Sequence, residues 1–338
     1  MIQISFIIPT LNAQKVLNKC LNSINKQNFS KSLYEILIID GGSIDKTVKI
    51  AKKYNTKIYK NPLKTAEAGK AVGIHQAKGK YICLLDSDNI LPEKNWLQKM
   101  LYPFNQNKEI IGNEPIEFTY RKNAGIIERY SALIGANDPY AFITGVYDKK
   151  NYLNNKWTDL KIDQIDKKQY IQIKLLPQCP IPTIGANGTI FKASFLKKNL
   201  KSNYFFDIDI ISQVLNQKQL PLLFTKVKTG IIHTYCESSI KKFIKKQHRR
   251  LADYYTYKVL RQYKWTSKNI WPQLKFSLYS ILIIPALIDS IRGFIKKPDP
   301  VWFFHPILCL ITFFVYTLTT IQFKLGLLRP INRISWHQ

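Results

Sequence analysis

A short apolar run that stops at two carboxylates constrains this sequence more than any other feature. The run Tyr81-Ile-Cys-Leu-Leu-Asp86-Ser-Asp88-Asn89 has the length and composition of a buried parallel strand. Its acidic residues then fall at the C-terminal end of that strand, where ligands bind in open α/β sheets. Asp86 and Asp88 repel each other unless a cation lies between them, and a divalent metal held with substrate phosphates meets that need. The same pair also suits an ordinary strand-to-helix turn, so the motif alone leaves both interpretations open.

The composition indicates a folded chain with a large positive charge. The chain has 338 residues, of which 46% are hydrophobic, enough for one large domain or two ordinary ones. Its net charge of +29 suits a phosphate-rich partner such as nucleic acid, anionic lipid or a nucleotide sugar, although a solvated lysine-rich surface accounts for most of it. The five cysteines are scattered, which disfavours structural zinc and a disulfide framework and favours a reducing compartment.

The first hundred residues alternate between strand and helix patterns. Four strands with intervening helices predict a doubly wound α/β sheet whose strands end in polar turns at one edge. Asp40 ends the second of these strands and is followed by Gly41, Gly42 and Ser43, where glycine lets the backbone approach a ligand closely. The expected strands are residues 3–8, 34–40, 57–60 and 81–86, and the expected helices are residues 15–26 and 65–78.

Three motifs in this region resemble those of the family 2 glycosyltransferases of the GT-A fold. They are Phe6-Ile-Ile-Pro9-Thr-Leu-Asn12, Ile38-Ile-Asp40-Gly-Gly-Ser43-Ile-Asp45-Lys-Thr47, and the segment from Ala77 to Asn89. The resemblance implies a GT-A doubly wound mixed sheet with a Rossmann-like nucleotide-binding half and a UDP- or GDP-sugar donor. It places Asp40 at the nucleotide base, and Asp86 with Asp88 at the diphosphate through Mg²⁺ or Mn²⁺. Further donor-binding residues that it implies are Pro9, Thr10, Asn12, Gly42, Ser43, Lys70 and Ser87.

The chain departs from the family pattern at two places in this half. Gly41 stands where a second acidic residue is common, and Ala71-Val72 stands where the family often has Arg-Asn. Further on, Pro182 to Lys192 resembles the family's glycine-containing loop and strand beneath the acceptor pocket, although a tight turn is an equal alternative.

Candidate catalytic residues lie in the second half. Phe206-Asp207-Ile208-Asp209 resembles the Glu-Asp-x-Asp segment that supplies the family's catalytic base, with Phe206 in place of the glutamate. The resemblance implies that Asp207 is the base and that Asp209 is the second catalytic candidate. Alternatively, the two are a cap and a first-turn acid that the helix dipole favours. His233 ends a later strand pattern, and the resemblance implies that it completes the metal site, whereas a lone histidine there is more often structural.

A basic helix follows from Ser238. Its segment Gln247-His248-Arg249-Arg250-Leu251 resembles the Gln-x-x-Arg-Trp motif of processive members, and Leu251 in place of tryptophan argues against processive synthesis. The resemblance implies that Arg250 contacts the leaving diphosphate. A solvated helix face is the alternative for most of the basic residues.

The C-terminal part turns apolar. Residues 276–288 are apolar but interrupted by Pro285, whereas residues 301–323 carry no charge over a length that can span a bilayer. Lys324, Arg329 and Arg333 follow. We expect a membrane-embedded pair of segments at uncertain depth, with a buried hairpin of a soluble protein as the alternative. The predicted domains are a GT-A catalytic domain (1–235), a basic amphipathic segment (236–270) and membrane-associated helices (271–338).

The resemblance implies a metal-dependent, inverting glycosyltransferase, and the charge and apolar segments favour a place on the cytoplasmic face of a membrane. It would move a sugar from a nucleotide donor to a lipid-linked or glycan acceptor in cell-surface polysaccharide or glycan synthesis. One alternative is a membrane-tethered basic binding protein without catalysis, but no nucleic-acid motif supports a nucleic-acid partner. The other is a sugar-phosphate nucleotidylyltransferase, which should open with a glycine- and arginine-rich loop that residues 9–12 lack.

Overall fold

The computed structural model describes residues 1–261, 263 and 270–328, and its contacts divide the chain into two compact units. The sheet unit comprises residues 1–116 and 161–233, and the helical unit comprises residues 117–160 with the described residues from 234 onward. The residues outside this description are 262, 264–269 and 329–338. They include Arg329 and Arg333.

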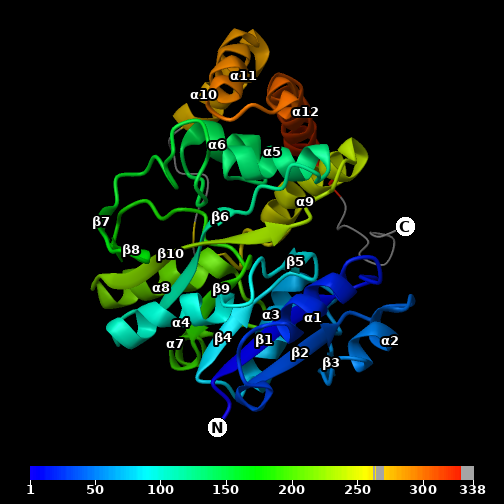
Figure 1. The fold of residues 1–338 in the computed structure, drawn as a ribbon. Coiled ribbons are helices and arrows are strands. Elements are labelled where there is room, and N and C mark those ends of the chain that lie inside the picture. The colour runs from blue at the N-terminus through cyan, green and yellow to red at the C-terminus, as the bar shows by residue number, and fades with distance from the viewer. Residues whose placement is uncertain (262, 264–269, 329–338) are drawn as a thin grey trace. The chain divides into compact units, whose positions relative to one another are not determined.

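The first half of the sheet unit is a parallel sheet in the order β3-β2-β1-β4 (Figure 1). Buried runs of Ile, Leu and Phe form its central strands, which confirms the predicted doubly wound arrangement. Thr10 pairs with Asp40 across β1 and β2, so the carboxyl ends of these strands meet at one edge. The strands are β1 (Ile4–Thr10), β2 (Tyr34–Asp40), β3 (Lys57–Lys60) and β4 (Tyr81–Leu84), joined by α1 (Leu17–Asn25), α2 (Thr47–Lys52) and α3 (Ala66–Gln76).

Helix α3 packs closely on β1 because glycines face the strand. A Cβ atom at Gly73 would lie 2.4 Å from Cγ2 of Ile7, and one at Gly69 would lie 3.0 Å from Cβ of Pro9. Thr65 caps the helix by accepting a hydrogen bond from the backbone N–H of Ala68. The start of α3 is therefore held in a fixed position beside the carboxyl end of β1.

The second half of the sheet contains antiparallel pairings, which makes the sheet mixed, as predicted for the GT-A fold. Strand β9 runs antiparallel to β4, and the order continues through β6, β10, β8 and β7. β10 is one continuous strand where the sequence predicts two, 220–224 and 228–232. These elements are β5 (Asn89–Ile90), α4 (Trp96–Gln106), β6 (Gly112–Phe118), β7 (Asp163–Asp166), β8 (Tyr170–Leu175), β9 (Thr189–Lys192), α7 (Ala193–Asn199), α8 (Asp207–Lys218) and β10 (Leu222–His233).

The helical unit joins residues 117–160 to the C-terminal helices around one core. Its buried side chains include Tyr130 and Leu133 of the earlier segment and Phe276, Trp302 and Leu308 of the later one. The sequence-based division at residues 235 and 270 stays a prediction, whereas the contacts group residues 117–160 with the C-terminal helices. The elements are α5 (Ile126–Ile134), α6 (Pro139–Thr144), α9 (Ile240–Thr256), α10 (Trp271–Leu282), α11 (Ile284–Lys296), η2 (Pro300–Phe304) and α12 (His305–Lys324).

The apolar C-terminal segments form three helices. Residues 300–324 make one helical stretch that is long and apolar enough to cross a membrane. The earlier apolar segment is broken at Ile283, where α10 and α11 meet at a bend of 81°. Pro285 follows the break, as its interruption of the sequence pattern predicts.

Candidate active site

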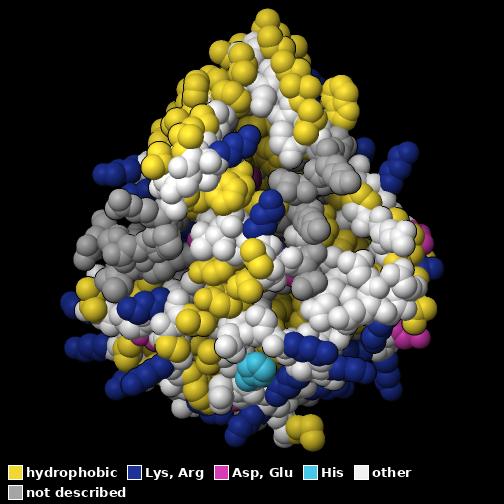
Figure 2. All heavy atoms as spheres, turned by 180° about the vertical axis from the view of Figure 1, so that it is seen from behind, with side chains coloured by type: hydrophobic (Ala, Val, Ile, Leu, Met, Phe, Trp, Pro, Cys, Tyr) yellow, Lys and Arg dark blue, Asp and Glu magenta, His cyan; other side chains and the backbone are white. Residues whose placement is uncertain are grey.

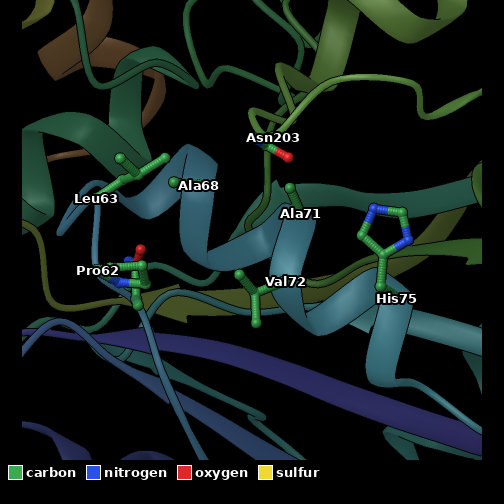
Figure 3. A pocket seen from close by; sticks show the side chains of 8 residues that line it. Pro62, Leu63, Ala68, Ala71, Val72, His75 and Asn203 are labelled. Carbon is green, nitrogen blue, oxygen red and sulfur yellow. The ribbon is translucent and has the colours of Figure 1, made fainter.

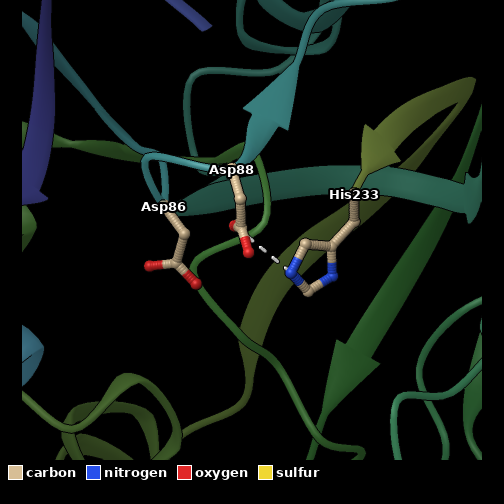
Figure 4. Close-up of side chains that lie close together, drawn as sticks. All are labelled: Asp86, Asp88 and His233. Carbon is tan, nitrogen blue, oxygen red and sulfur yellow. Dashed lines mark ion pairs between the residues drawn. The ribbon is translucent and has the colours of Figure 1, made fainter. Parts of the chain in front are cut away.

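Two carboxylates and an imidazole come together at the end of β4. Asp86 and Asp88 lie in the turn that follows the strand, and His233 is the last residue of β10 (Figure 4). One ligand atom from each residue lies within 4.8 Å of the others, and Nε2 of His233 is 3.4 Å from Oδ1 of Asp88. The antiparallel pairing of β10 with β5 sets His233 opposite Asn89 and so fixes the histidine beside the acidic turn.

The donor set of this cluster fits a divalent cation. Neighbouring ligands of an octahedral ion at about 2.1 Å lie about 3 Å apart, close to the separation of His233 and Asp88. Carboxylate oxygens suit Mg²⁺ and Mn²⁺, while an added imidazole nitrogen is a donor that softer divalent ions accept more readily than Mg²⁺. Asp86, Asp88 and His233 are therefore the residues that would hold the predicted Mg²⁺ or Mn²⁺.

Two asparagines support the acidic turn. The Asn89 side chain accepts a hydrogen bond from the backbone N–H of Asp86 at 3.0 Å and donates one to Oδ1 of Asn187 at 3.1 Å. The backbone N–H of Gly188, which has φ of +79°, donates to the carbonyl of Leu84. The glycine-containing loop therefore lies against the metal turn. Asn89 directly follows the acidic motif in sequence, but nothing in the sequence points to Asn187.

The second motif folds into a turn around the Asp40 carboxylate. Oδ1 of Asp40 accepts hydrogen bonds from the hydroxyls of Thr10 and Ser43, and Oδ2 accepts from the backbone N–H groups of Gly42 and Ser43. Asn12 is joined to the same turn by its backbone N–H, which donates to the Ser43 hydroxyl. These four bonds match the four acceptor positions of a carboxylate, so a nucleotide base that binds Asp40 must replace one of them.

The predicted base is ion-paired with Lys70. Nζ of Lys70 lies 3.2 Å from Oδ2 of Asp207, and their side chains are 7% and 19% exposed. Oδ1 of Asp207 is buried and has no hydrogen-bond partner among the described residues. An acceptor hydroxyl that donates to this oxygen would satisfy it.

Electrostatics at this pair follow from burial and from a local excess of carboxylates. Burial alone lowers the pKa of Lys70, but nearby carboxylates, first that of Asp207 and then that of Asp86, raise it to about 12. Burial raises the pKa of the Asp207 carboxyl, and the Lys70 ammonium opposes that rise. Lys70 is thus held as a cation between the base and the carboxylates of the metal turn.

Asp207 and Asp209 differ in their surroundings. The N-cap of α8 is Phe206, so Asp207 is the first helical residue and the alternative that it caps the helix is wrong. Asp209 is only 5% exposed and lies two residues further into the helix, at a different azimuth. Its side chain therefore cannot share the position of Asp207.

A comparison of the sequence with protein-family models decides the family. The model described as glycosyl transferase family 2 matches residues 5–198, more than half of the chain. This chain belongs to glycosyl transferase family 2. The predicted family and transferase activity are therefore confirmed.

Two named relatives match part of this family 2 chain. It is 31% identical over 136 residues to Glycosyltransferase AglE of Haloferax volcanii, covering 38% of this chain and 44% of that one. It is 34% identical over 97 residues to the poly(ribitol-phosphate) beta-N-acetylglucosaminyltransferase TarS of Staphylococcus aureus, covering 27% of this chain and 17% of that one. The chain thus spans less than half the length of these two relatives.

A third relative matches from end to end. It is the dolichyl N-acetyl-alpha-D-glucosaminyl phosphate 3-beta-D-2,3-diacetamido-2,3-dideoxy-beta-D-glucuronosyltransferase of Methanococcus voltae, 26% identical over 353 residues, covering 96% of this chain and 97% of that one. Among solved structures, a mannosyltransferase from Pyrobaculum calidifontis in complex with GDP-Man and Mn²⁺ shares the fold, with a TM-score of 0.50 and 9% identity over 93% of this chain and 87% of that one.

The chain's departure from the family pattern at Ala71-Val72 lies beside a pocket. These two residues line a pocket of about 330 Å³ on α3, together with Ala68 and His75 of the same helix and Asn203 (Figure 3). Small side chains leave this face of the helix open, whereas Gly69 and Gly73 face β1. The residues that line this pocket include none of the predicted site residues.

Arg250, which the family resemblance places at the diphosphate, belongs to the helical unit. Its guanidinium lies 3.2 Å from Oδ2 of Asp138 and donates a hydrogen bond to Oε1 of Gln247 at 2.8 Å. The side chain is 39% exposed, so part of it is open to solvent. Its role at the donor stays a prediction.

Proposed function

We propose that this family 2 glycosyltransferase is a metal-dependent, inverting enzyme that transfers a sugar from a UDP- or GDP-sugar to a hydroxyl of a lipid-linked or glycan acceptor. The observation that carries the proposal is the presence, in one compact unit, of a metal-ligand cluster and a buried carboxylate with an unsatisfied oxygen. The first suits a nucleotide diphosphate, and the second suits a hydroxyl that must lose its proton.

Asp207 acts as the general base in this proposal. Its unpartnered Oδ1 accepts the acceptor hydroxyl proton as the oxygen attacks the anomeric carbon, and the bond to the diphosphate breaks on the opposite face. Lys70 holds the other carboxylate oxygen and keeps Asp207 oriented. Asp86, Asp88 and His233 would hold a divalent cation, which would compensate the charge of the departing diphosphate.

Acceptor class and location rest on the relatives and on the chain's own surfaces. The end-to-end relative is named as acting on a dolichyl phosphate-linked sugar, which supports a lipid-linked acceptor. One helix of this chain is apolar enough for a membrane, which supports association with a bilayer. All five cysteines are free thiols, which suits the proposed location of the catalytic unit on the cytoplasmic face.

The metal is tested by donor binding. We expect UDP- or GDP-sugars to raise the thermal stability of full-length protein only with Mn²⁺ or Mg²⁺, by about 2.7 kcal/mol at a donor concentration 100-fold above Kd. Asp88→Ala should lose this effect because the cation loses a ligand. Asp163→Ala, at an exposed acid on β7, is the matched control and should keep it. Equal donor binding in a chelator or in Asp88→Ala would remove the metal from the proposed function.

A further inference from the structure

The helical unit exposes a continuous apolar surface along its three C-terminal helices. Figure 2 shows hydrophobic side chains gathered over the end of this unit that α10, α11 and α12 form. Large exposed side chains there are 37–72% exposed, far more than the core of the same unit. They include Leu278, Ile281, Leu282, Ile284, Leu287, Ile291, Phe314 and Leu318. A surface of this size and composition needs an apolar partner.

Helices α10 and α11 form a wedge that is too short to cross a bilayer. Their lengths are about 18 and 20 Å, and with the 81° bend between them the apex reaches about 12 Å from the open ends, within the about 15 Å of one leaflet. Residues 276–288, which include the apex, carry no charge. Asp289, just beyond, accepts hydrogen bonds from Tyr279 and Arg292, so its charge is paired.

Helix α12 forms hydrogen bonds with polar side chains of its own unit near both of its ends. His305 at its start bonds the Tyr130 hydroxyl of α5 at 2.7 Å, and Thr319 near its end bonds Nδ1 of His248 in α9 at 2.8 Å. The opposite stripe of the helix is apolar and outward, at residues 307, 314, 318, 321 and 325. This is the pattern of a helix that lies in the plane of a membrane surface.

The contact with α9 argues against a crossing by α12. Tyr255 of α9 stacks on Phe323 at 4.1 Å between ring centroids, so the last two turns of α12 run beside the second half of α9. Seven of the 17 residues of α9 are charged. A crossing by α12 would carry Arg249 and Asp253 to bilayer depth, which strongly opposes insertion. In Figure 1, α10 and α11 project away from α5 and α6, whereas α12 returns to α9.

We propose that the helical unit is monotopic: the wedge of α10 and α11 and the outer stripe of α12 enter one leaflet of a lipid bilayer, α9 lies among the headgroups, and no described segment crosses. This inference rests on the membrane part of the proposed function and adds the depth and the topology. The lysines of α9 supply the attraction to anionic headgroups. They are Lys241, Lys242, Lys245 and Lys246.

Thiol labelling of full-length protein on sealed vesicles of phosphatidylcholine and phosphatidylglycerol tests this topology. The parent is Cys179→Ser, because Cys179 is exposed and the other four thiols are buried. A membrane-impermeant maleimide should label Lys241→Cys and Leu327→Cys without detergent, and Leu282→Cys only after detergent is added. Protection of Leu327→Cys until detergent is added would show that α12 crosses, and free labelling of Leu282→Cys would show that the wedge stays outside; either result overturns the proposal.

Vesicle flotation tests the wedge by a second route. Leu282→Glu should lower the partition of the protein into vesicles by about 100-fold, the scale for one acidic side chain in hydrocarbon. Ile44→Glu, at a residue 74% exposed in the sheet unit, is the control and should float like the parent. A parent that stays in solution as a dimer without floating overturns both the topology and membrane association, and assigns the apolar surface to a second copy. Sugar transfer, measured in parallel, then decides the catalytic part of the proposed function on its own.

Discussion

Lys70 joins the two halves of the proposed chemistry at one side chain. Its ammonium bonds the Asp207 carboxylate and lies within the field of Asp86 in the metal turn. A cation in this place lowers the energy of the ionised base and is attracted to a diphosphate that binds beside Asp86. Lys70 can therefore act in two ways. Its effect on Asp207 would change the pH dependence of transfer, and its attraction to the donor would change KM.

Replacing Lys70 should change the pH dependence of transfer. Lys70 opposes the rise that burial gives the pKa of Asp207, so without the cation that pKa is higher still. A base works only when deprotonated, and activity is lost as pH falls through its pKa. We therefore expect the acid limb of kcat against pH to move to higher pH in Lys70→Met and to stay in place in Lys70→Arg. If the acid limb of the kcat profile moves in neither variant, Lys70 does not influence the pKa of the base.

Substitutions at the two aspartates of α8 should have unequal effects. Asp207→Asn keeps the shape but cannot take a proton, so transfer should fall by roughly 10²-fold or more while donor binding stays near normal. Asp209→Asn should do less, because Asp209 is buried on another face of the helix. Transfer rates and donor affinity of both variants are the measurement. If only Asp209→Asn abolishes transfer, the base is two residues further along the chain.

Sequence reasoning predicted candidate residues for the site but not their pairing. Asp86 and Asp88 end a strand, and their family motif is local, so they could be predicted from one segment. The bond between Lys70 and Asp207 joins residues 137 apart, and the bond between Asn89 and Asn187 joins residues 98 apart. Such pairs depend on the tertiary fold, and no local pattern reveals them.

At the scale of elements, β1, β2 and β4 were predicted closely because each is a buried apolar run. β10 was predicted as two strands because Thr225 and Lys226 interrupt its apolar pattern. Both are fully buried in the structure, where Lys226 forms an ion pair with the equally buried Glu114 of β6. The sequence pattern therefore predicted a loop at this segment, because the partner of its buried charge lies on a neighbouring strand.

The close contact of α3 with β1 predicts a stability effect. A methyl group at Gly73 would meet the fully buried Ile7 at 2.4 Å, so Gly73→Ala must displace the helix or the side chain. Overpacking costs about 1–3 kcal/mol, and the better helix propensity of alanine offsets about 1 kcal/mol of it. Urea unfolding should show a net loss of up to about 2 kcal/mol.

The control for Gly73→Ala lies on the same helix. His75→Ala changes an exposed side chain and should alter the free energy of unfolding by less than about 0.5 kcal/mol. A Gly73→Ala protein as stable as this control would show that α3 can move away from β1 at little cost.

At the scale of the molecule, the chain is organised by contacts between distant segments. Residues 117–160 lie between strands of the sheet unit in sequence, yet they share a core with the C-terminal helices. The sequence showed an apolar patch at residues 124–134 but no chemistry, because its partners come more than a hundred residues later. The apolar C-terminal helices are therefore both a proposed membrane surface and part of a folded core.

Deleting residues 271–338 should accordingly do more than detach the protein from a membrane. It removes Phe276, Trp302 and Leu308 from the core of the helical unit. Three such losses cost about 8–15 kcal/mol together, as much as the whole stability of a domain, so residues 117–160 should lose their hydrogen-exchange protection. The predicted donor residues other than Arg250 lie in residues 1–233, so donor-dependent protection of β1, β2 and α3 should persist. Retained protection in residues 117–160 would instead support the division at residue 270 that the sequence predicts.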